Sequence, residues 1–168
     1  MAAFRRRKMR TVVTLGTMVL GLGIGTQRTW ATAAPPDPCS LLTAAQVSNA
    51  LGQQYGTPEK SVAPRPFRNT AQGTDCQYKS ANGHDQVLFR IYFDDSASQA
   101  TDLHARLKMF FGKDSTAASV GDEAYVDNKD AIHVRKGNVR YFISISHGET
   151  PAGQKQILDL AALVATEL

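Results

Sequence analysis

Arginine, histidine and aromatic residues alternate with apolar residues in two stretches that have the pattern of β-strands, residues 86–93 and 131–146. Successive side chains of a strand point to opposite faces of its sheet. If the aliphatic positions face a core and the two stretches belong to one sheet, one set of side chains faces away from the core: Arg90, Tyr92, His133, Arg135, Arg140 and Phe142. Guanidinium groups pair with carboxylates or phosphates, and aromatic rings supply stacking area. This face is therefore predicted to be a shallow docking surface for an anionic group.

A simpler interpretation of the same face remains open. Asp or Glu side chains from neighbouring strands could pair with the arginines, which would leave an ordinary solvated sheet face. The two interpretations differ in whether Arg135 and Arg140 lie beside carboxylates.

The sequence contains no pattern that indicates a catalytic residue, a metal site or a cofactor. The adjacent carboxylates Asp94-Asp95 and Asp122-Glu123 would point to opposite faces of an extended segment, so we expect helix-entry and turn roles for them. The acidic turn at residues 127–130 lacks the glycine and distal glutamate of a calcium-binding loop. His104 borders an apolar helix face, where we expect a packed side chain rather than a base. An active site assembled from distant residues would leave no such pattern.

The two cysteines, Cys39 and Cys76, favour a disulfide. An even number of cysteines in an exported chain indicates a bridge, because an oxidising compartment forms and keeps it. The residues leave a metal ligand, a nucleophile and a free thiol open as alternatives. Cys39 follows Pro36-Asp37-Pro38 rather than a lipobox, so we expect no lipid on it. A bridge would close a loop of about 38 residues and stabilise the fold by roughly 4 kcal/mol.

Residues 1–33 have the three zones of a secretory signal peptide. A basic segment precedes an apolar segment of 15 residues (11–25), and Ala31-Thr32-Ala33 is the small-x-small pattern after which signal peptidase cuts. Because about 20 apolar residues are needed to span a bilayer, we expect cleavage before Ala34 rather than a membrane anchor. The mature domain, residues 34–168, is then exported to the periplasm or the medium, with no stable membrane insertion.

Removing the leader changes the charge balance of the chain. The whole chain has 19 Lys and Arg against 15 Asp and Glu, and six of the basic residues and none of the acidic ones lie in residues 1–33. The remaining 135 residues therefore carry 13 basic and 15 acidic side chains. A near-neutral domain has no basic footprint for nucleic acid, and this length suits a single domain.

The first helix has clear start and stop signals. Thr43-Ala44-Ala45-Gln46 is a capping box, and Leu42 and Val47 stand at the positions of a hydrophobic staple. Gly52 is placed to end the helix. The segment that follows, residues 53–72, is rich in Pro, Gly and Arg and resembles a linker.

The rest of the chain alternates between strands and helices. The predicted elements are a hairpin of residues 76–79 and 86–93, a helix over residues 96–111, a strand over residues 123–126, a hairpin over residues 131–146 with Gly137-Asn138 at its tip, and a helix from Pro151 onward. The order helix, hairpin, helix, three strands, helix predicts an α+β fold. We expect a single antiparallel sheet with the helices packed on one face.

Several motifs resemble a family of small exported bacterial envelope proteins that carry a domain of unknown function. They are Asp37-Pro38-Cys39-Ser40-Leu41-Leu42-Thr43, Val47 with Leu51-Gly52, Cys76 with Tyr78, Val120-Gly121-Asp122-Glu123-Ala124-Tyr125, and residues 134–137, and together they span most of residues 37–147. Many members are lipoproteins whose mature part begins D-x-C-x-L-L-T, and this chain departs from them by lacking a lipobox. The resemblance implies an extracytoplasmic α+β domain with a bridge between the two matching cysteines, and it implies no catalytic or binding residues.

These observations predict an exported, non-catalytic domain that needs no cofactor. It would bind a small ligand, a wall component or another envelope protein, and its partner would be an envelope protein or an anionic ligand. A small secreted hydrolase with a dispersed active site is the alternative. Titratable side chains clustered in a closed pocket would favour the enzyme, and a broad open face would favour binding.

Overall fold

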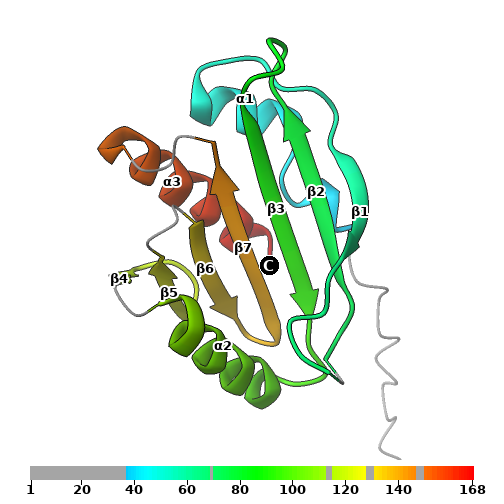
Figure 1. Cartoon of the computed structure of the whole chain (residues 1–168), viewed down its shortest axis with the longest axis vertical. Coiled ribbons are helices and arrows are strands. Elements are labelled where there is room, and N and C mark those ends of the chain that lie inside the picture. Colours follow the sequence, from blue (N-terminus) through cyan, green and yellow to red (C-terminus); the bar gives the residue numbers. More distant parts are fainter. Residues whose placement is uncertain (1–36, 69, 113–114, 128–130, 147–149) are drawn as a thin grey trace, which may run out of the picture. The chain divides into compact units, whose positions relative to one another are not determined.

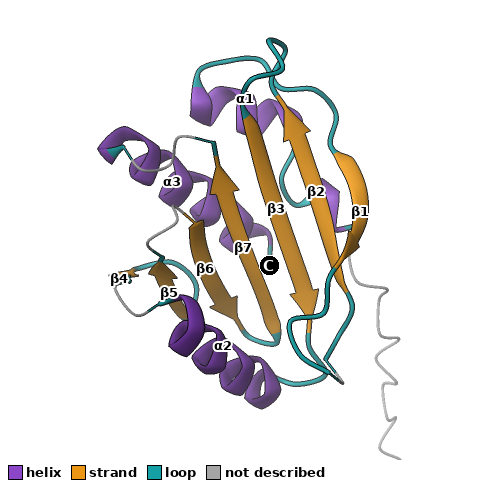
Figure 2. Ribbon diagram, viewed as in Figure 1, coloured by secondary structure: helices purple, strands orange, loops and turns teal. Residues whose placement is uncertain are grey.

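The computed structural model describes residues 37–168 except 69, 113–114, 128–130 and 147–149, and these residues belong to one compact unit. In this described part, seven strands form one antiparallel sheet in the order β1-β2-β3-β7-β6-β5-β4 (Figure 1). The α+β class and the single antiparallel sheet predicted from the sequence are confirmed. The strands are β1 (Glu59–Ala63), β2 (Gly73–Lys79), β3 (Gln86–Phe93), β4 (Thr116–Ala118), β5 (Glu123–Val126), β6 (Ala131–Lys136) and β7 (Val139–Ile145). The helices are η1 (Pro38–Ser40), α1 (Ala44–Leu51), α2 (Ala97–Phe111) and α3 (Pro151–Glu167) (Figure 2).

Pairing between β3 and β7 joins the two predicted hairpins into one sheet. Arg90 of β3 lies opposite Phe142 of β7. Within the β6–β7 hairpin, Val134 lies opposite Tyr141, as the two-residue turn at Gly137-Asn138 predicts. Side chains from both hairpins therefore share the same two faces of the sheet.

The main hydrophobic core lies on the face of the sheet that α1 and α3 cover (Figure 1). Ile132 and Ile143 from the sheet and Ile157 from α3 have no exposed surface. Tyr141 is buried in the same layer and donates a hydrogen bond to the carbonyl of Ala161 at 2.7 Å. This layer holds α3 against β6 and β7.

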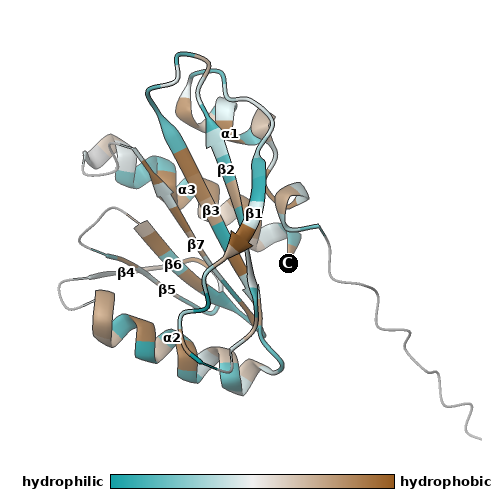
Figure 3. Cartoon of the chain, turned by 45° about the vertical axis from the view of Figure 1, so that its right-hand side comes forward, coloured by the Kyte–Doolittle hydropathy of each residue, from teal (hydrophilic) through white to brown (hydrophobic). Residues whose placement is uncertain are grey.

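Helix α2 lies on the opposite face, which corrects the expectation that the helices pack on one face (Figure 3). The ring of His104 in α2 is 5.2 Å from that of Tyr125, and the ring of Phe111 in α2 lies parallel to that of His133 at a centroid distance of 6.3 Å. His133 follows Ile132 in β6, so the two side chains point to opposite faces. The apolar stripe of α2 predicts that the helix packs on the sheet, but it does not indicate on which of the two sheet faces.

Helix α1 begins and ends where the sequence predicts. Thr43 Oγ1 accepts a hydrogen bond from the Gln46 amide at 3.2 Å, and the Thr43 amide donates to Gln46 Oε1 at 2.7 Å. Leu42 and Val47 are fully buried. Gly52 ends the helix with a left-handed φ of 68°, which glycine adopts without steric cost.

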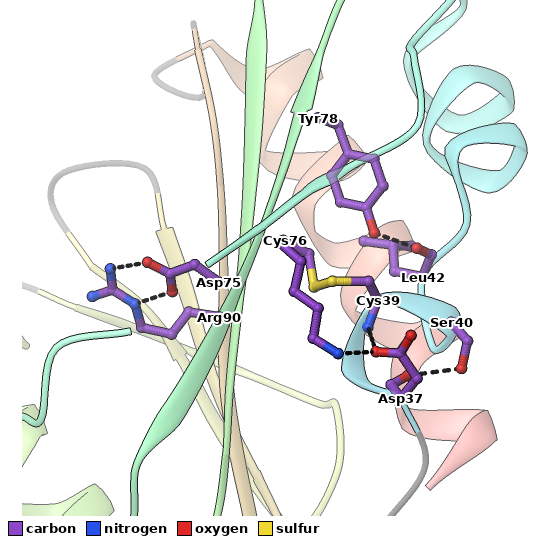
Figure 4. The surroundings of a disulfide bond; sticks show 9 residues. Asp37, Cys39, Ser40, Leu42, Asp75, Cys76, Tyr78 and Arg90 are labelled. Carbon is purple, nitrogen blue, oxygen red and sulfur yellow. Dashed lines mark hydrogen bonds and ion pairs between the residues drawn. A yellow bond between two sulfur atoms is a disulfide. The ribbon is translucent and has the colours of Figure 1, made fainter. Parts of the chain in front are cut away.

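A disulfide joins Cys39 to Cys76, with a Cα–Cα distance of 5.6 Å, and confirms the pairing predicted for the two cysteines. Figure 4 shows Cys76 and Tyr78 on one side of β2 and Asp75 on the other. The Tyr78 hydroxyl donates to the carbonyl of Leu42, two residues before α1. The bridge and this hydrogen bond fasten the segment before α1 to the core face of β2.

The sequence pattern does not reveal the two edge strands, β1 and β4. Strand β1 lies inside the segment interpreted as a linker, and only Ala63 among its side chains is buried. Lys60 of β1 forms an exposed ion pair with Asp37 at 2.7 Å. Both edge strands are too short or too polar to show hydrophobic alternation, and the charged side chains of β1 also discourage pairing with other chains.

Candidate functional site: a pocket between the sheet and helix α2

A pocket of about 780 Å³ lies between the sheet and helix α2. Its floor is the sheet face opposite the main core, formed by side chains of β3, β6 and β7. Side chains of α2 form one wall, and the segment of residues 64–67, between β1 and β2, contributes another. A volume of this size can accommodate a small organic molecule.

A row of planar side chains crosses five strands in register and forms part of the floor. It runs through Asp75, Arg90, Phe142, His133 and Tyr125. Arg90 donates two hydrogen bonds to Asp75, at 2.6 and 2.7 Å (Figure 4), and its guanidinium lies 5.2 Å from the centre of the Phe142 ring. Phe142, His133 and Tyr125 then stack with centroid distances of 5.5 and 4.7 Å. Such cross-strand pairs stabilise the sheet and fix the orientation of each ring.

Tyr92 and Arg140 form a second pair on the same face. An ion pair with Asp94 fixes Arg140, and the absence of a side chain at Gly73 leaves room for Tyr92. Arg140 donates two hydrogen bonds to Asp94, at 2.5 and 3.0 Å, and the two residues are only 2% and 3% exposed. The Arg140 guanidinium lies 5.1 Å from the Tyr92 ring centre. A Cβ at Gly73 would come within 2.5 Å of that ring, so glycine leaves the space that Tyr92 fills. The Tyr92 hydroxyl donates to the carbonyl of Pro64 at 2.8 Å and ties the wall to the floor.

Two histidines lie beside the floor in different environments. His133 Nε2 is 3.0 Å from Asp127 Oδ2. His104 is almost fully buried, and burial lowers its pKa to about 4, so its imidazole is neutral at pH 7. His104 Nε2, Arg140 Nη1 and the Tyr125 hydroxyl are buried without a hydrogen-bond partner. Such unpaired groups are uncommon in folded proteins and call for an explanation.

The mouth of the pocket is apolar and only partly packed. The ring of Phe67 lies 6.2 Å from that of Phe110, and Arg106 stacks over Phe67 at 4.3 Å. Phe110 and Phe111, in the last turn of α2, are 69% and 47% exposed. The helix therefore packs closely on the sheet near Leu103 and leaves its C-terminal aromatic side chains beside the opening.

Most of the residues predicted to form a docking face lie at the pocket. Arg90, Tyr92, His133, Arg140 and Phe142 line it. Arg135 is not among the lining residues and pairs with the exposed Asp122 at 2.9 Å. All three arginines thus have carboxylate partners, as the simpler interpretation of this face expects. Instead of an open cationic surface, the face is the floor of a pocket beneath α2.

The sequence interpretation did not identify the carboxylates that pair with these arginines. Asp75 directly precedes the core-facing Cys76, so alternation alone places Asp75 on the face of Arg90, and the signal was present. For Asp94 the sequence predicts a role at the entry of a helix. Its bond to Arg140, 46 residues away, depends on the pairing of β3 with β7, which no local pattern indicates.

The described part of the chain has neither a metal-binding cluster nor a membrane-spanning helix. Within it, no group of three or more His, Cys, Asp or Glu side chains could hold a metal ion. No helix among the same residues is long and apolar enough to cross a bilayer. Asp127 of the predicted acidic turn pairs with His133, and residues 128–130 lie outside the described residues.

Comparison with known proteins does not assign a role to this pocket. No protein-family model matches the chain, and no curated protein sequence matches it. The chemistry of the pocket must therefore be inferred from its own residues.

Proposed function

We propose that the protein is an exported, non-catalytic domain that binds a small ligand in the pocket between the sheet and α2. One observation carries this proposal: Arg90, Arg140 and His133 at the floor each pair with an aspartate of the protein itself. Much of the remaining lining is aromatic. Such a floor offers shape and contact area, because its charged side chains are already paired within the protein.

The location outside the cytoplasm is supported by the N-terminal pattern and by the cysteine pair. Residues 1–33 have the zones of a signal peptide. Disulfides persist mainly in oxidising compartments, and Cys39 and Cys76 form one. The motifs shared with exported bacterial envelope proteins agree with this location. The ligand would then be a small molecule of the periplasm or medium, or part of an envelope partner.

Amide NMR of the exported, ¹⁵N-labelled protein tests for such binding. The protein is titrated with three classes of compound: aromatic acids, short aliphatic acids and amino sugars. We expect at least one class to shift the amide signals of Phe111, His133 and Phe142 and to leave those of α1 unchanged. If no class moves these signals, the proposal is wrong.

A glycine variant links binding to the geometry of the pocket. Gly73→Ala would force the Tyr92 ring to move, because the new methyl group would lie 2.5 Å from it. We expect the affinity for any compound found in the titration to fall severalfold. Gly56→Ala is the matched control, since the nearest atom to its new Cβ is a backbone oxygen at 3.9 Å. If Gly73→Ala and Gly56→Ala lowered the affinity equally, the compound would not bind in this pocket.

A small secreted hydrolase is the second candidate function, and the His133–Asp127 pair favours it. A carboxylate bound to one imidazole nitrogen is a common way to orient a general base. Hydrolysis of 4-nitrophenyl acetate and 4-nitrophenyl phosphate tests this candidate. A rate above background that His133→Gln removes, and that His84→Gln in an exposed turn does not, would replace the binding proposal with an enzymatic one.

A further inference from the structure

The rings on the pocket floor present their edges, not their faces, to the pocket. His133 is stacked on one side by Tyr125 and on the other by Phe142, with interplanar angles of 8° and 19°. The second face of Phe142 is covered by the Arg90 guanidinium. Because these residues are cross-strand neighbours, the stack runs along the sheet and the ring edges point out of it.

The ring edges and the unpaired guanidinium nitrogen of Arg140 give the floor a positive electrostatic character. The edge of an aromatic ring carries partial positive charge, and its face carries partial negative charge. Arg140 lines the same floor, and its buried Nη1 has no hydrogen-bond partner. A guanidinium nitrogen can only donate hydrogen bonds. The floor is therefore complementary to the face of an electron-rich ring and to an acceptor oxygen.

A ligand atom would explain why Arg140 keeps a buried donor without a partner. Arg140 donates to Asp94 from Nε and Nη2, and its third nitrogen, Nη1, has no partner, although the residue is only 2% exposed. His104, 1% exposed, also lines the pocket with an unpaired Nε2. An oxygen that accepts from Arg140 would remove the penalty of leaving a buried donor without a bond.

The formal charges around the pocket balance, which limits the charge of the ligand. Arg65, Arg90 and Arg140 line it, and they are offset by Asp127 in the lining and by the partners Asp75 and Asp94. Arg65 lies at the wall and donates to Gln72 rather than to a carboxylate. A neutral compound or a monoanion fits this balance, whereas the positive ring edges and Arg140 disfavour a cation.

We propose that the pocket binds aromatic carbonyl compounds, meaning an electron-rich planar ring that carries a carbonyl or carboxylate oxygen. The ring lies over the edges of His133 and Phe142, and the oxygen accepts a hydrogen bond from Arg140 Nη1. Sugars stack their C–H groups on open aromatic faces, and the floor rings have theirs covered. This assignment of the ligand class rests on the binding function proposed above.

Matched ligands test the class by amide NMR of the exported protein. The probe is 4-hydroxybenzoate, compared with trans-4-hydroxycyclohexanecarboxylate, which lacks the aromatic ring, with 4-methylphenol, which lacks the carboxylate, and with N-acetylglucosamine. We expect 4-hydroxybenzoate to shift the signals of His133 and Phe142. It should bind about tenfold tighter than the saturated acid and about tenfold tighter than 4-methylphenol. Equal affinity of the saturated acid, or preferential binding of N-acetylglucosamine in the pocket, would overturn the ligand class and leave the binding function standing. Failure of every probe to shift these signals would count against both.

A variant on β7 tests the role of the ring edges. Phe142→Leu should weaken 4-hydroxybenzoate binding by about fivefold and change binding of the saturated acid little. Ile145→Val, on the same strand and the opposite face, is the control and should leave both affinities unchanged. An unchanged preference for the aromatic acid in the Phe142→Leu protein would contradict the proposal.

Discussion

Arg140 and Arg135 lie on the same face of the sheet, and their surroundings give them different energetic roles. The side chains of Arg140 and Asp94 are 3% and 0% exposed, whereas Asp122, the partner of Arg135, is 47% exposed. Removing one member of a buried ion pair leaves an uncompensated charge and is strongly destabilising. An exposed pair usually contributes less than about 1 kcal/mol.

Asp94→Asn is expected to lower the free energy of unfolding by roughly 3 kcal/mol or more, because Arg140 would stay buried without its counter-charge. Arg135→Gln should cost less than about 1 kcal/mol. Urea denaturation at pH 7 measures both values. Lys155→Gln, which breaks the exposed pair with Asp159, is the control and should change stability little. Equal losses for Asp94→Asn and Arg135→Gln would contradict the assignment of the buried pair.

His104 is expected to make the fold less stable in mild acid. Burial lowers its pKa from 6.5 to about 4, so between these pH values the unfolded chain binds a proton that the folded protein does not. Unfolding is then favoured as pH falls, and the contribution of neutral His104 to stability is lost progressively from pH 6.5 to pH 4. The total effect is on the order of 3 kcal/mol.

The measurement is urea denaturation at pH 7 and pH 4.5 for the original protein and for His104→Leu. The variant should lose less stability on acidification, because it lacks the titrating group. His84→Asn, in an exposed turn, should show the same pH dependence as the original protein. If His104→Leu also keeps the full pH dependence, the acid sensitivity comes from other groups.

At the scale of the elements, the capping box of α1 is the most direct link between sequence and stability. Thr43→Ala removes the side-chain acceptor for the Gln46 amide and should cost about 1 kcal/mol. Thr43→Ser keeps the hydroxyl and should recover most of that loss. Thermal or urea unfolding gives both values. A Thr43→Ala protein as stable as the original would show that the cap contributes nothing.

The elements that the sequence predicts are those with strong local signals. Helix α1 is bounded by the Thr43 cap and by Gly52, and the β6–β7 hairpin turns at Gly137, where φ is 57°. Strand β1 has four exposed side chains in five positions, so no alternation marks it. Caps and turn glycines indicate where a helix or strand begins and ends, but they do not indicate which other elements pack against it.

The same limit explains which part of the pocket was predictable. Strand alternation within the β6–β7 hairpin places His133 and Phe142 on one face, and Arg90 joins them because β3 pairs with β7. That α2 covers this face depends on long-range packing, such as the contact between His104 and Tyr125. The floor of the pocket was therefore accessible to sequence reasoning, and its walls were not.

For the whole molecule, the disulfide and the predicted cleavage of residues 1–33 can be tested together by intact mass. Protein recovered after export should begin at Ala34, and Cys39 and Cys76 should resist alkylation until reduced. A retained leader, or two thiols that react without reductant, would contradict this prediction. Replacing both cysteines by Ala should lower the free energy of unfolding by roughly 4 kcal/mol, because the unfolded chain loses a constraint on a loop of about 38 residues.

The disulfide also decides how the domain would respond to mechanical force. A pull on the chain before Cys39 passes through the bridge to Cys76 in β2, a strand paired on both sides by β1 and β3. The 36 residues between the cysteines, which include α1 and β1, bear no tension. Extended, they would span on the order of 120 Å. In single-molecule pulling between the two ends, the oxidised domain should lengthen by about that much less than the reduced one.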